Sequence, residues 1–411
     1  MNASAVPVPP LKVAVVTETY PPEVNGVAMT VGRLVQGLRA RGHLVTVIRP
    51  RQPGDGDVGA GGASAPADRT VAGLPLPGYP GLRFGLPAKS RLLREWRHER
   101  PDVVHLVTEG PLGWSALGAA RRLGIPATSG FHTNFDRYSV HYGMGFLRPA
   151  VAAYLRTFHR RTRATLAPTM ALAADLAGEG IPGVKVVGRG VDTSLFDPAR
   201  RDDGLRAAWG VGEGGLAVLS VGRLAAEKNL PLTLKAFAAI RARRPDARLV
   251  LVGDGPLRRG LEERHPEHRF AGVRIGEDLA AHYASGDLFL FPSLTETFGN
   301  VTLEALASGV PTVAYRSAAA AELIADGVQG LTVSPGDEDA FAAAAVALAL
   351  DDAGRPRLGR AARERALACA WEQVVGDFEA VLRAVSAGDG PQPYAAEVAG
   401  AAGSLPSAPT V

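Results

Sequence analysis

Two glutamates stand eight positions apart in the stretch ETFGNVTLE, residues 296–304, on either side of a Phe-Gly-Asn turn. The stretch follows the apolar run LFLFPS and precedes ALASGVP, an order that predicts a strand, a turn and a helix start. Free N–H groups at a helix start attract anions, whereas ionised carboxylates accept hydrogen bonds from hydroxyl groups. Glu296 and Glu304 are therefore expected to bind hydroxyl groups on either side of a bound anion. A nucleotide sugar, with a diphosphate between a ribose and a hexose, has this arrangement.

A second loop, VGRLAAEKN, follows another apolar run and contains Arg223 and Lys228. Arginine presents a planar fork to phosphate oxygens and lysine a mobile point charge, so the pair could neutralise a diphosphate. Read alone, the loop could equally be a solvated basic surface. A third loop, VGDGP, places Gly253 and Gly255 where the backbone could approach a ligand, or where the chain could simply make a tight turn. The dinucleotide fingerprint is incomplete because residue 258 is arginine, which argues against a nicotinamide dehydrogenase.

Metal and thiol chemistry have little support in the sequence. The DGD motif at residues 55–57 lies in Gly-rich text without a preceding apolar strand, so we expect no metal there. Cys369 is the only cysteine, which excludes an intrachain disulfide and fits a reducing compartment. Its Ala-rich helical surroundings favour a small buried core residue over a nucleophile.

The elements that must position these loops occur in two consecutive cycles of strands and helices. The first cycle begins with the buried-strand run at residues 13–16, followed by helical text and the strand LVTVIRP. The second begins with LAVLSVGRL at residues 216–224 and continues in strand–helix alternation to VPTVAY. Alternation with short connections predicts parallel sheets, whose ligands bind at the carboxyl ends of the strands. The fold class is therefore α/β, with two Rossmann-like doubly wound domains.

We predict an acceptor-side domain over residues 1–190 and a donor-binding domain over residues 191–370. A crossover helix over residues 371–386 is expected to return to the first domain. The tail at residues 387–411 is rich in Ala, Gly, Pro and Ser and is expected to be disordered, like the loop at residues 53–67.

The charge distribution and the hydropathy of the chain indicate where in the cell the protein is expected. The first 200 residues hold 24 Lys and Arg against 14 Asp and Glu, within totals of 45 and 41. Two basic stretches, KSRLLREWRHER and LRPAVAAYLRTFHRRTRA, could dock on an anionic membrane surface or simply be solvated helix faces. We see no signal peptide and no apolar run long enough to span a bilayer. These features indicate a cytoplasmic protein, peripheral on the membrane at most, without a nucleic-acid partner.

The ordered set of motifs resembles retaining glycosyltransferases with the GT-B fold, specifically glycosyltransferase family four. The resemblance covers residues 12–385 and is highly specific as a set. Within the family the chain looks most like GDP-mannose-dependent α-mannosyltransferases and sulfoquinovosyltransferases. It rests on PPEVNGVAMTVGRL, FHTNFDRY, GRGVDTSLFDP, VGRLAAEKNL, VGDGP and FPSLTETFGNVTLEALASGVP. The GT-B fold implies that the two domains face each other across a cleft.

The resemblance implies a role for each donor-side residue. Glu296 would hold the hydroxyls of the transferred sugar and Glu304 those of the ribose. Arg223 and Lys228 would bind the diphosphate and stabilise the leaving group, and Arg274 would contact the base. The backbone amides that would cap the phosphate are those of Phe298, Gly299, Asn300 and Val301.

In the first domain, the resemblance places Gly26 beside the diphosphate and the acceptor, and His132 beside the reacting centre. From its own setting, a polar loop after a strand, His132 could also be a hydrogen-bonded structural residue. Tyr138 and Tyr142 could be acceptor walls or core residues. Glu109, which follows the strand in DVVHLVT, is a weaker candidate for acceptor contact.

The reaction class follows from the resemblance and from what the sequence lacks. We find no carboxylate with a convincing setting as a nucleophile, so the expected reaction takes place on one face of the sugar and retains its configuration. No cofactor or metal is expected. The partners would be a nucleotide-diphospho-sugar, with GDP-mannose favoured, and a lipid or glycolipid acceptor. Alternatives are a UDP-sugar-dependent glycolipid synthase, a nucleotide-sugar epimerase on the same fold, and a non-catalytic nucleotide-sugar-binding protein.

Overall fold

The computed structural model describes residues 9–23, 25–52, 55, 68–75, 83–132 and 148–389. The described chain forms two compact units. The first takes the residues up to His132, Pro149–Val187 and those from Val375 onward, and the second takes Arg148 and Gly188–Val374. The predicted tail from residue 390 and most of the predicted loop at residues 53–67 lie outside the described residues.

The first unit contains a seven-stranded sheet in the order β3-β2-β1-β6-β7-β8-β9, and every pairing in it is parallel. Its central strands are fully buried or nearly so, as continuous apolar text predicts for a sheet covered on both faces. The strands are β1 (Lys12–Val16), β2 (Leu44–Pro50), β3 (Arg69–Val71), β6 (Val103–Leu106), β7 (Ala127–Gly130), β8 (Ala164–Ala167) and β9 (Val184–Val186).

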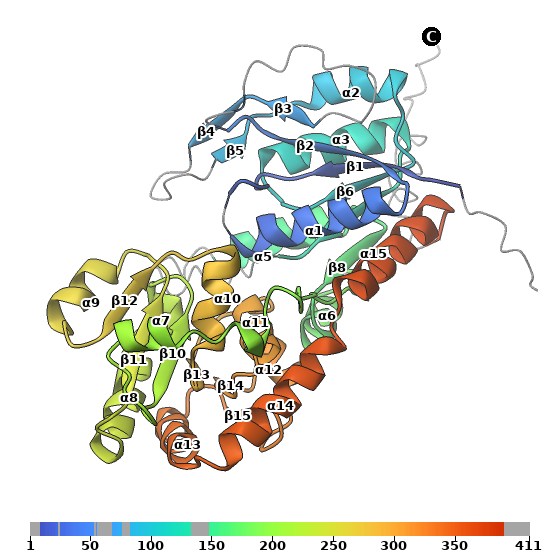
Figure 1. Cartoon of the computed structure of the whole chain (residues 1–411). Helices are drawn as coiled ribbons and strands as arrows, with labels where there is room; N and C mark the ends of the chain where they lie inside the picture. The colour runs from blue at the N-terminus through green and yellow to red at the C-terminus, as the bar shows by residue number, and fades with distance from the viewer. Residues whose placement is uncertain are drawn as a thin grey trace, which may run out of the picture. The chain divides into compact units, whose positions relative to one another are not determined.

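Helices form most of the crossover connections that parallel strands need (Figure 1). They are α1 (Gly26–Ala40), α2 (Lys89–His98), α3 (Pro111–Leu123), α5 (Arg148–His159) and α6 (Met170–Gly178). In the basic stretch LRPAVAAYLRTFHRRTRA, the helix α5 ends at His159. An antiparallel pair, β4 (Gly73–Pro75) and β5 (Arg83–Gly85), lies between β3 and α2 in the chain and was not predicted.

The second unit contains a six-stranded parallel sheet in the order β12-β11-β10-β13-β14-β15. Counted within the unit, this is the order 3-2-1-4-5-6 of dinucleotide-binding folds. The strands are β10 (Ala217–Val221), β11 (Arg248–Val252), β12 (Arg269–Gly272), β13 (Leu288–Phe291), β14 (Thr312–Tyr315) and β15 (Gly330–Val333). The sequence predicted all of them except β15.

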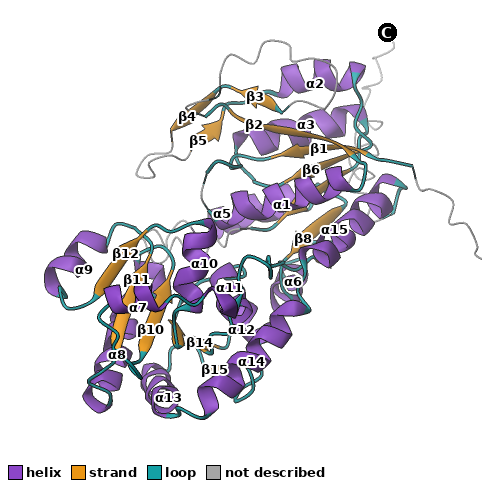
Figure 2. Cartoon of the chain, in the orientation of Figure 1, coloured by secondary structure: helices purple, strands orange, loops and turns teal. Residues whose placement is uncertain are grey.

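The helices of the second unit flank this sheet (Figure 2). They are α7 (Asp203–Ala208), α8 (Leu230–Arg243), α9 (Arg258–Arg264), α10 (Gly276–Ala284), α11 (Asn300–Ala307), α12 (Ala318–Leu323), α13 (Glu338–Leu350) and α14 (Gly354–Leu367). The apolar run FAAAAVALAL lies in α13, which packs on α8 and buries Phe341, Ala345, Leu348 and Ala349.

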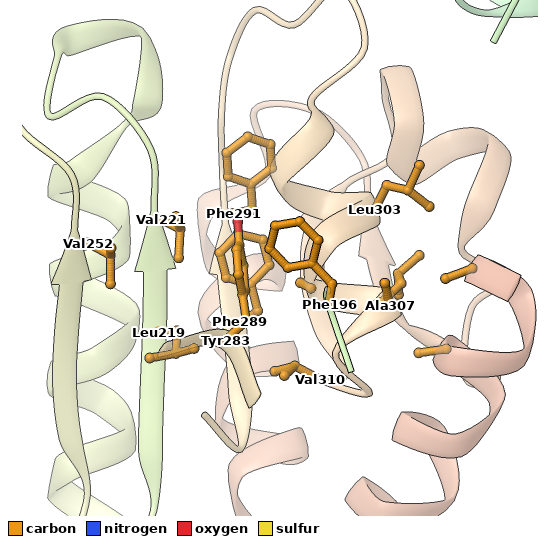
Figure 3. Close-up of a cluster of buried hydrophobic side chains, with 14 of the residues drawn as sticks. Phe196, Leu219, Val221, Val252, Tyr283, Phe289, Phe291, Leu303, Ala307 and Val310 are labelled. Carbon is orange, nitrogen blue, oxygen red and sulfur yellow. The ribbon is translucent and has the colours of Figure 1, made fainter. Parts of the chain in front are cut away.

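One apolar cluster joins the sheet of the second unit to the helices that present the candidate site (Figure 3). Phe289 and Phe291 of β13 stack at a centroid distance of 5.6 Å, and Tyr283 of α10 meets Phe289 edge-on at 6.0 Å. Leu303 of α11 and Phe298 pack against the same cluster. Burial of these side chains fixes α10 and α11 relative to β13.

The last helix, α15 (Trp371–Ser386), spans the residues predicted for the crossover helix. In the first unit its Glu379 carboxylate accepts hydrogen bonds from Arg41 at 2.9 Å and from Arg383 at 2.8 Å, and lies 3.0 Å from His43 Nε2. Phe378 meets the ring of His105 edge-on at 4.9 Å. These contacts attach the end of α15 to α1 and β6. None of the helices that the structure describes is long and apolar enough to cross a membrane.

Candidate active site

The loops after β10 and β13 form the site in the second unit. These two strands are neighbours in the sheet, and the strand order reverses between them. Connections leave in opposite directions at such a point, so the carboxyl ends of the two strands border an open crevice where ligands bind. The loop after β10 carries Arg223 and Lys228, and the loop after β13 carries Glu296.

Lys228 and Glu296 join these two loops. The Lys228 ammonium donates a short hydrogen bond to Glu296 Oε1, which also accepts one from Ser293 Oγ at 2.7 Å. Both charged side chains are largely buried, at 17% and 12% exposure, and the ammonium lies 5.5 Å from the centre of the Phe291 ring. An ion pair shielded from water holds both groups in place more firmly than a solvated one.

The start of α11 supplies the predicted anion site. Gly299 precedes the helix with φ 89° and ψ 66°, a left-handed conformation that glycine adopts without strain, and provides no side-chain cap. The first amides of a helix have no intrahelical acceptor, so they are available to an anion here. Phe298 is buried in the core, and its carbonyl accepts a hydrogen bond from Ala319 at 2.8 Å. This anchoring fixes the direction of the amides of Phe298, Gly299, Asn300 and Val301.

Glu304 lies one helical turn further along α11. Its Oε2 accepts a hydrogen bond of 2.9 Å from the hydroxyl of Tyr283. Loss of hydration raises the pKa of Glu304 to about 7, although the Tyr283 bond works in the opposite direction. The carboxylate therefore changes charge near neutral pH, and a ligand that donates hydrogen bonds to it would favour the ionised form.

Close packing of the backbone requires a glycine at position 253, which the sequence did not indicate. With φ 134°, a Cβ at this position would lie 2.0 Å from the carbonyl oxygen of Gly222, and one at Gly255 would lie 2.5 Å from that of Leu224. The two glycines thus let the loop after β11 cross the backbone on both sides of Arg223. Arg223 itself is exposed. A direct contact of Gly253 with the donor stays a prediction.

Arg274 lies at the far edge of this unit, after β12. Its Nε donates to the carbonyl of Ala271 at 2.8 Å, and Nη1 pairs with Asp278 at 3.0 Å. These bonds hold the guanidinium against the start of α10. Contact with a base stays a prediction for this residue.

In the first unit, Gly26 is the exposed first residue of α1, whose amide at Ala28 is capped by Asn25 at 2.9 Å. The N-terminal amides of α3 also have an acceptor within the chain. Glu18, after β1, accepts hydrogen bonds from the amide of Leu112 at 3.0 Å and from that of Gly85. Burial raises the pKa of Glu18, against the effect of these backbone bonds. A carboxylate of the chain itself thus fills the anion position of α3, whereas α11 has no such cap.

His132 follows β7 in the first unit and is partly exposed. Its ring folds back over Gly130, so closely that a Cβ at Gly130 would lie 2.2 Å from His132 Nε2. The preceding residue, Phe131, is buried at 4% exposure and anchors the start of the loop. Gly130 therefore sets the position of the imidazole. A catalytic role of His132 stays a prediction.

Glu109 is buried at 6% exposure, and its Oε1 lies 3.1 Å from His159 Nε2. His159 Nδ1 lies in turn 2.9 Å from Ser129 Oγ, and the Tyr154 hydroxyl of α5 donates to the Glu109 carbonyl. These contacts give Glu109 a structural role in fastening the loop after β6 to α5. The predicted acceptor contact of Glu109 is untested, and Tyr138 and Tyr142 lie outside the described residues.

Asp55 of the DGD motif and the thiol of Cys369 are held by contacts that do not suit metal binding or nucleophilic chemistry. Asp55 forms a two-pronged ion pair with Arg49 at 2.7 and 2.9 Å, and this hydrogen bonding lowers the pKa of Asp55 to about 2. Burial raises the pKa of the half-buried Cys369 thiol, so it stays protonated at neutral pH.

One group in the described chain could hold a metal ion, with ligand atoms of His265, Glu267 and His268 within 4.8 Å of one another. The group precedes β12 and therefore lies at the amino edge of the sheet, opposite the candidate site.

Three residues with positioning contacts escaped the sequence analysis, two in the site of the second unit and one in the first unit. Ser293 and Tyr283 hold the two glutamates, and Glu18 fills the start of α3. Ser293 lies three positions before Glu296 in the loop after an apolar strand, a signal that could have been used. The contacts of Tyr283 and Glu18 join distant segments, so the sequence carries no local sign of them.

The two parallel-sheet units match known GT-B glycosyltransferase structures. HepE of Anabaena, solved in complex with UDP and glucose, superposes with a TM-score of 0.69 over 91% of this chain and 99% of its own, at 20% identity. This confirms the predicted fold class.

The family follows from sequence comparison. Residues 24–195 match the family described as Glycosyltransferase Family 4, and residues 215–351 match Glycosyl transferases group 1. A GDP-mannose-dependent alpha-mannosyltransferase of Mycolicibacterium smegmatis is 38% identical over 90% of this chain and 98% of its own length. The chain belongs to glycosyltransferase family 4 and is a hexosyltransferase, as predicted.

Other relatives act on different sugars according to their names. The sulfoquinovosyl transferase SQD2 of Arabidopsis thaliana is 31% identical over 72% of this chain and 59% of its own length. An alpha-monoglucosyldiacylglycerol synthase of Streptococcus pneumoniae is 29% identical over 78% of this chain and 74% of its own length.

Proposed function

We propose that the protein transfers mannose from GDP-mannose to a hydroxyl group of a lipid or glycolipid acceptor, with retention of configuration. The observation that carries the proposal is the pairing of Lys228 with Glu296 beside the uncapped start of α11. Cation, carboxylate and helix amides thus gather at the carboxyl ends of two adjacent strands. This set suits a diphosphate with a hexose beside it.

The identity of the donor rests on the mannosyltransferase relative, which matches this chain over nearly its whole length. A lipid acceptor rests on the diacylglycerol named in a more distant relative. The protein would act in the cytoplasm, and the basic residues near the end of α5, among them Arg156, Arg160 and Arg161, would favour an anionic membrane surface.

In the proposed reaction the acceptor oxygen bonds to the anomeric carbon while the bond from that carbon to the diphosphate oxygen breaks. The acceptor proton passes to an oxygen of the leaving diphosphate on the same face of the sugar. Arg223, Lys228 and the α11 amides stabilise the charge that develops on the diphosphate, so the proposal includes no metal ion. Glu296 orients the hexose by accepting its hydroxyl hydrogens.

The test combines binding and product analysis. The purified protein is heated with GDP-mannose, UDP-glucose or ADP-glucose, and the favoured donor should raise the melting temperature with concentration. Proton NMR of the mannosylated product should show the α configuration of the donor. An inverted product would exclude the same-face mechanism, and stabilisation by UDP-glucose alone would exclude GDP-mannose. Donor binding without transfer to any lipid acceptor would indicate a non-catalytic binding protein, and sugar interconversion without acceptor an epimerase.

A further inference from the structure

A pocket of about 450 Å³ opens in the first unit and is lined by none of the residues considered so far. Among the lining residues that the structure describes, three are arginines and none is acidic: Arg51, Arg83 and Arg91 join Gln52, Thr70, Ala72 and Gly73. A concave site with one sign of charge concentrates ligands of the opposite sign. The lining alone therefore points to an anionic ligand.

Short segments hold the arginines in place. Arg51 directly follows β2, Arg83 lies on β5 and Arg91 on α2, all in the upper part of Figure 1. Arg83 Nη2 donates to the carbonyl of Gly73 at 2.6 Å, and Arg91 Nη1 donates to that of Thr70 at 2.8 Å. Backbone carbonyls thus orient two of the guanidinium groups, and only that of Arg91 also pairs with a carboxylate, that of Glu95.

Several of the donor groups remain available. Arg83 Nε is buried and has no hydrogen-bond partner among the described residues. Arg91 Nε pairs with Glu95 at 2.7 Å, but a guanidinium carries five N–H groups and this arginine uses only part of them. Arg51 is exposed at the pocket mouth. The oxygens of a phosphate, sulfonate or carboxylate would satisfy these donors.

Gln52 adds a different requirement. It is buried at 7% exposure, and its amide nitrogen donates to Tyr20 O at 3.1 Å and to Glu23 Oε1 at 2.8 Å. The amide oxygen is buried and has no partner in the described structure. A buried acceptor without a donor is unfavourable, and a ligand hydroxyl that donates to it would remove this cost. The pocket therefore fits an anionic group that carries a neighbouring hydroxyl.

The pocket also lies at the carboxyl ends of the strands in the first unit, the unit that is predicted to bind the acceptor. It opens beyond the carboxyl ends of β2 and β3, and Gln52 is bonded to the loop after β1 that leads to Gly26. We propose that this pocket binds the anionic head of the acceptor, a hydroxyl-bearing phosphate, sulfonate or carboxylate. The assignment to the acceptor rests on the proposed transferase function, whereas the anion specificity rests on the pocket alone.

Isothermal titration with small probes tests the assignment. Glycerol 3-phosphate and glucuronate carry the required groups, and glycerol and glucose are their uncharged counterparts. The wild-type protein should bind at least one charged probe and neither neutral one. The double variant R51Q/R83Q should bind it at least about tenfold more weakly, since two charge-assisted contacts are lost. Gln52→Leu should weaken glycerol 3-phosphate but not inorganic phosphate.

Arg97→Gln is the matched control, because Arg97 is an exposed arginine of α2 outside the pocket. Unchanged affinity in R51Q/R83Q, or equal binding of the neutral probes, would overturn the proposal. GDP-mannose binding by the same variants verifies folding and separates the two hypotheses. Failure of wild type to bind any nucleotide sugar would count against the proposed function. Intact donor binding together with unchanged probe affinity in R51Q/R83Q would count against this inference alone.

A second arm identifies the source of the anion. Phosphatidylglycerol vesicles should displace glycerol 3-phosphate from the wild type if the head belongs to a lipid, and phosphatidylcholine vesicles should not. Displacement by neither would assign the pocket to a soluble anionic acceptor instead. Equal displacement by both would contradict a charge-selective site.

Discussion

Lys228 binds Glu296 across the point where the strand order of the second sheet reverses. The cation that is predicted to meet the diphosphate is thereby positioned by the carboxylate that is predicted to hold the sugar. Ser293 adds a second hydrogen bond to the same oxygen of Glu296. The two predicted functions therefore depend on each other through one contact, and removal of either group should disturb both.

This dependence predicts non-additive kinetics. Lys228→Met should lower kcat/KM by about 100-fold or more, because a preorganised charge at a leaving group contributes several kcal/mol. Glu296→Gln should lower it as well. The double variant should lose much less than the product of the two single losses, since the residues act as a unit. Steady-state kinetics with GDP-mannose gives all four values.

Lys235→Met is the control for the loss of a lysine. Lys235 lies on α8 and pairs at the surface with Asp339 at 2.9 Å, where an ion pair contributes little. This variant should behave like the wild type. Strictly multiplicative losses in Lys228→Met and Glu296→Gln would contradict the coupling.

Nucleotide affinity should depend on pH through Glu304. The pKa of this carboxyl is about 7 in the free protein, so protonation competes with its role as an acceptor for ribose hydroxyls. The affinity for GDP is expected to increase as the pH rises from about 6 to 8. Glu304→Gln should bind GDP more weakly and show a flatter profile over this range. Isothermal titration at several pH values measures both effects.

The same pKa has a consequence for folding. An acid with a raised folded pKa binds more protons in the native state, so its contribution destabilises the fold as pH increases from about 4.5 to about 7. Wild type should lose stability relative to Glu304→Gln over this window in urea unfolding. If GDP bound Glu304→Gln as tightly as wild type at every pH, the assignment of the ribose to Glu304 would be wrong.

The close approach of Gly130 to His132 predicts a selective loss of turnover. Gly130→Ala would place a methyl group 2.2 Å from the imidazole Nε2, so the ring must move away. We expect kcat to fall toward the value of His132→Ala while GDP affinity, a property of the second unit, stays unchanged. Gly178→Ala is the matched control, because a Cβ there meets nothing within 4 Å. Full activity of Gly130→Ala would show that the ring position is unimportant.

The sequence predicted the repeated strands and the residues in the loops after them well, because both are local signals. Continuous apolar runs identified β10, β11 and β13, and the chain leaves each of them into the loops that carry Arg223, Gly253 and Glu296. The strands β3, β4 and β5 have three residues each, and β4 and β5 contain Gly or Pro, so they carry no apolar run or alternating pattern. They and the arginine pocket beside them were therefore missed.

Tertiary contacts explain the other omissions. Glu18 meets the start of α3 over 94 positions of sequence, and Tyr283 meets Glu304 between two helices. The glycines of VGDGP were predicted to let the backbone approach a ligand, and the structure adds a contact that the sequence did not indicate, between Gly253 and the backbone of Gly222. No single sequence specifies which backbone passes beside a glycine.

The contacts of Glu379 predict how the stability of the protein changes at acidic pH. Burial raises the pKa of this carboxyl, but hydrogen bonds from Arg383, Arg41 and His43 prevail and lower it to about 2. A depressed folded pKa stabilises the protein fully above the unfolded value near 4.5, and this contribution is lost as the pH falls toward 2. The shift corresponds to about 3 kcal/mol. Glu379→Gln should therefore be less stable than wild type at pH 7 by an amount of this order, measured by urea unfolding.

The difference between wild type and Glu379→Gln should shrink as the pH falls from about 4.5 toward 2, because the unfolded chain then binds a proton that the folded Glu379 carboxylate does not bind. Glu364→Gln, at an exposed glutamate of α14, should match wild type at pH 7. Arg41→Gln should reproduce part of the loss, since it removes one donor to the same carboxylate. A pH-independent difference between wild type and Glu379→Gln would mean that the glutamate stabilises α15 by packing and not by its charge.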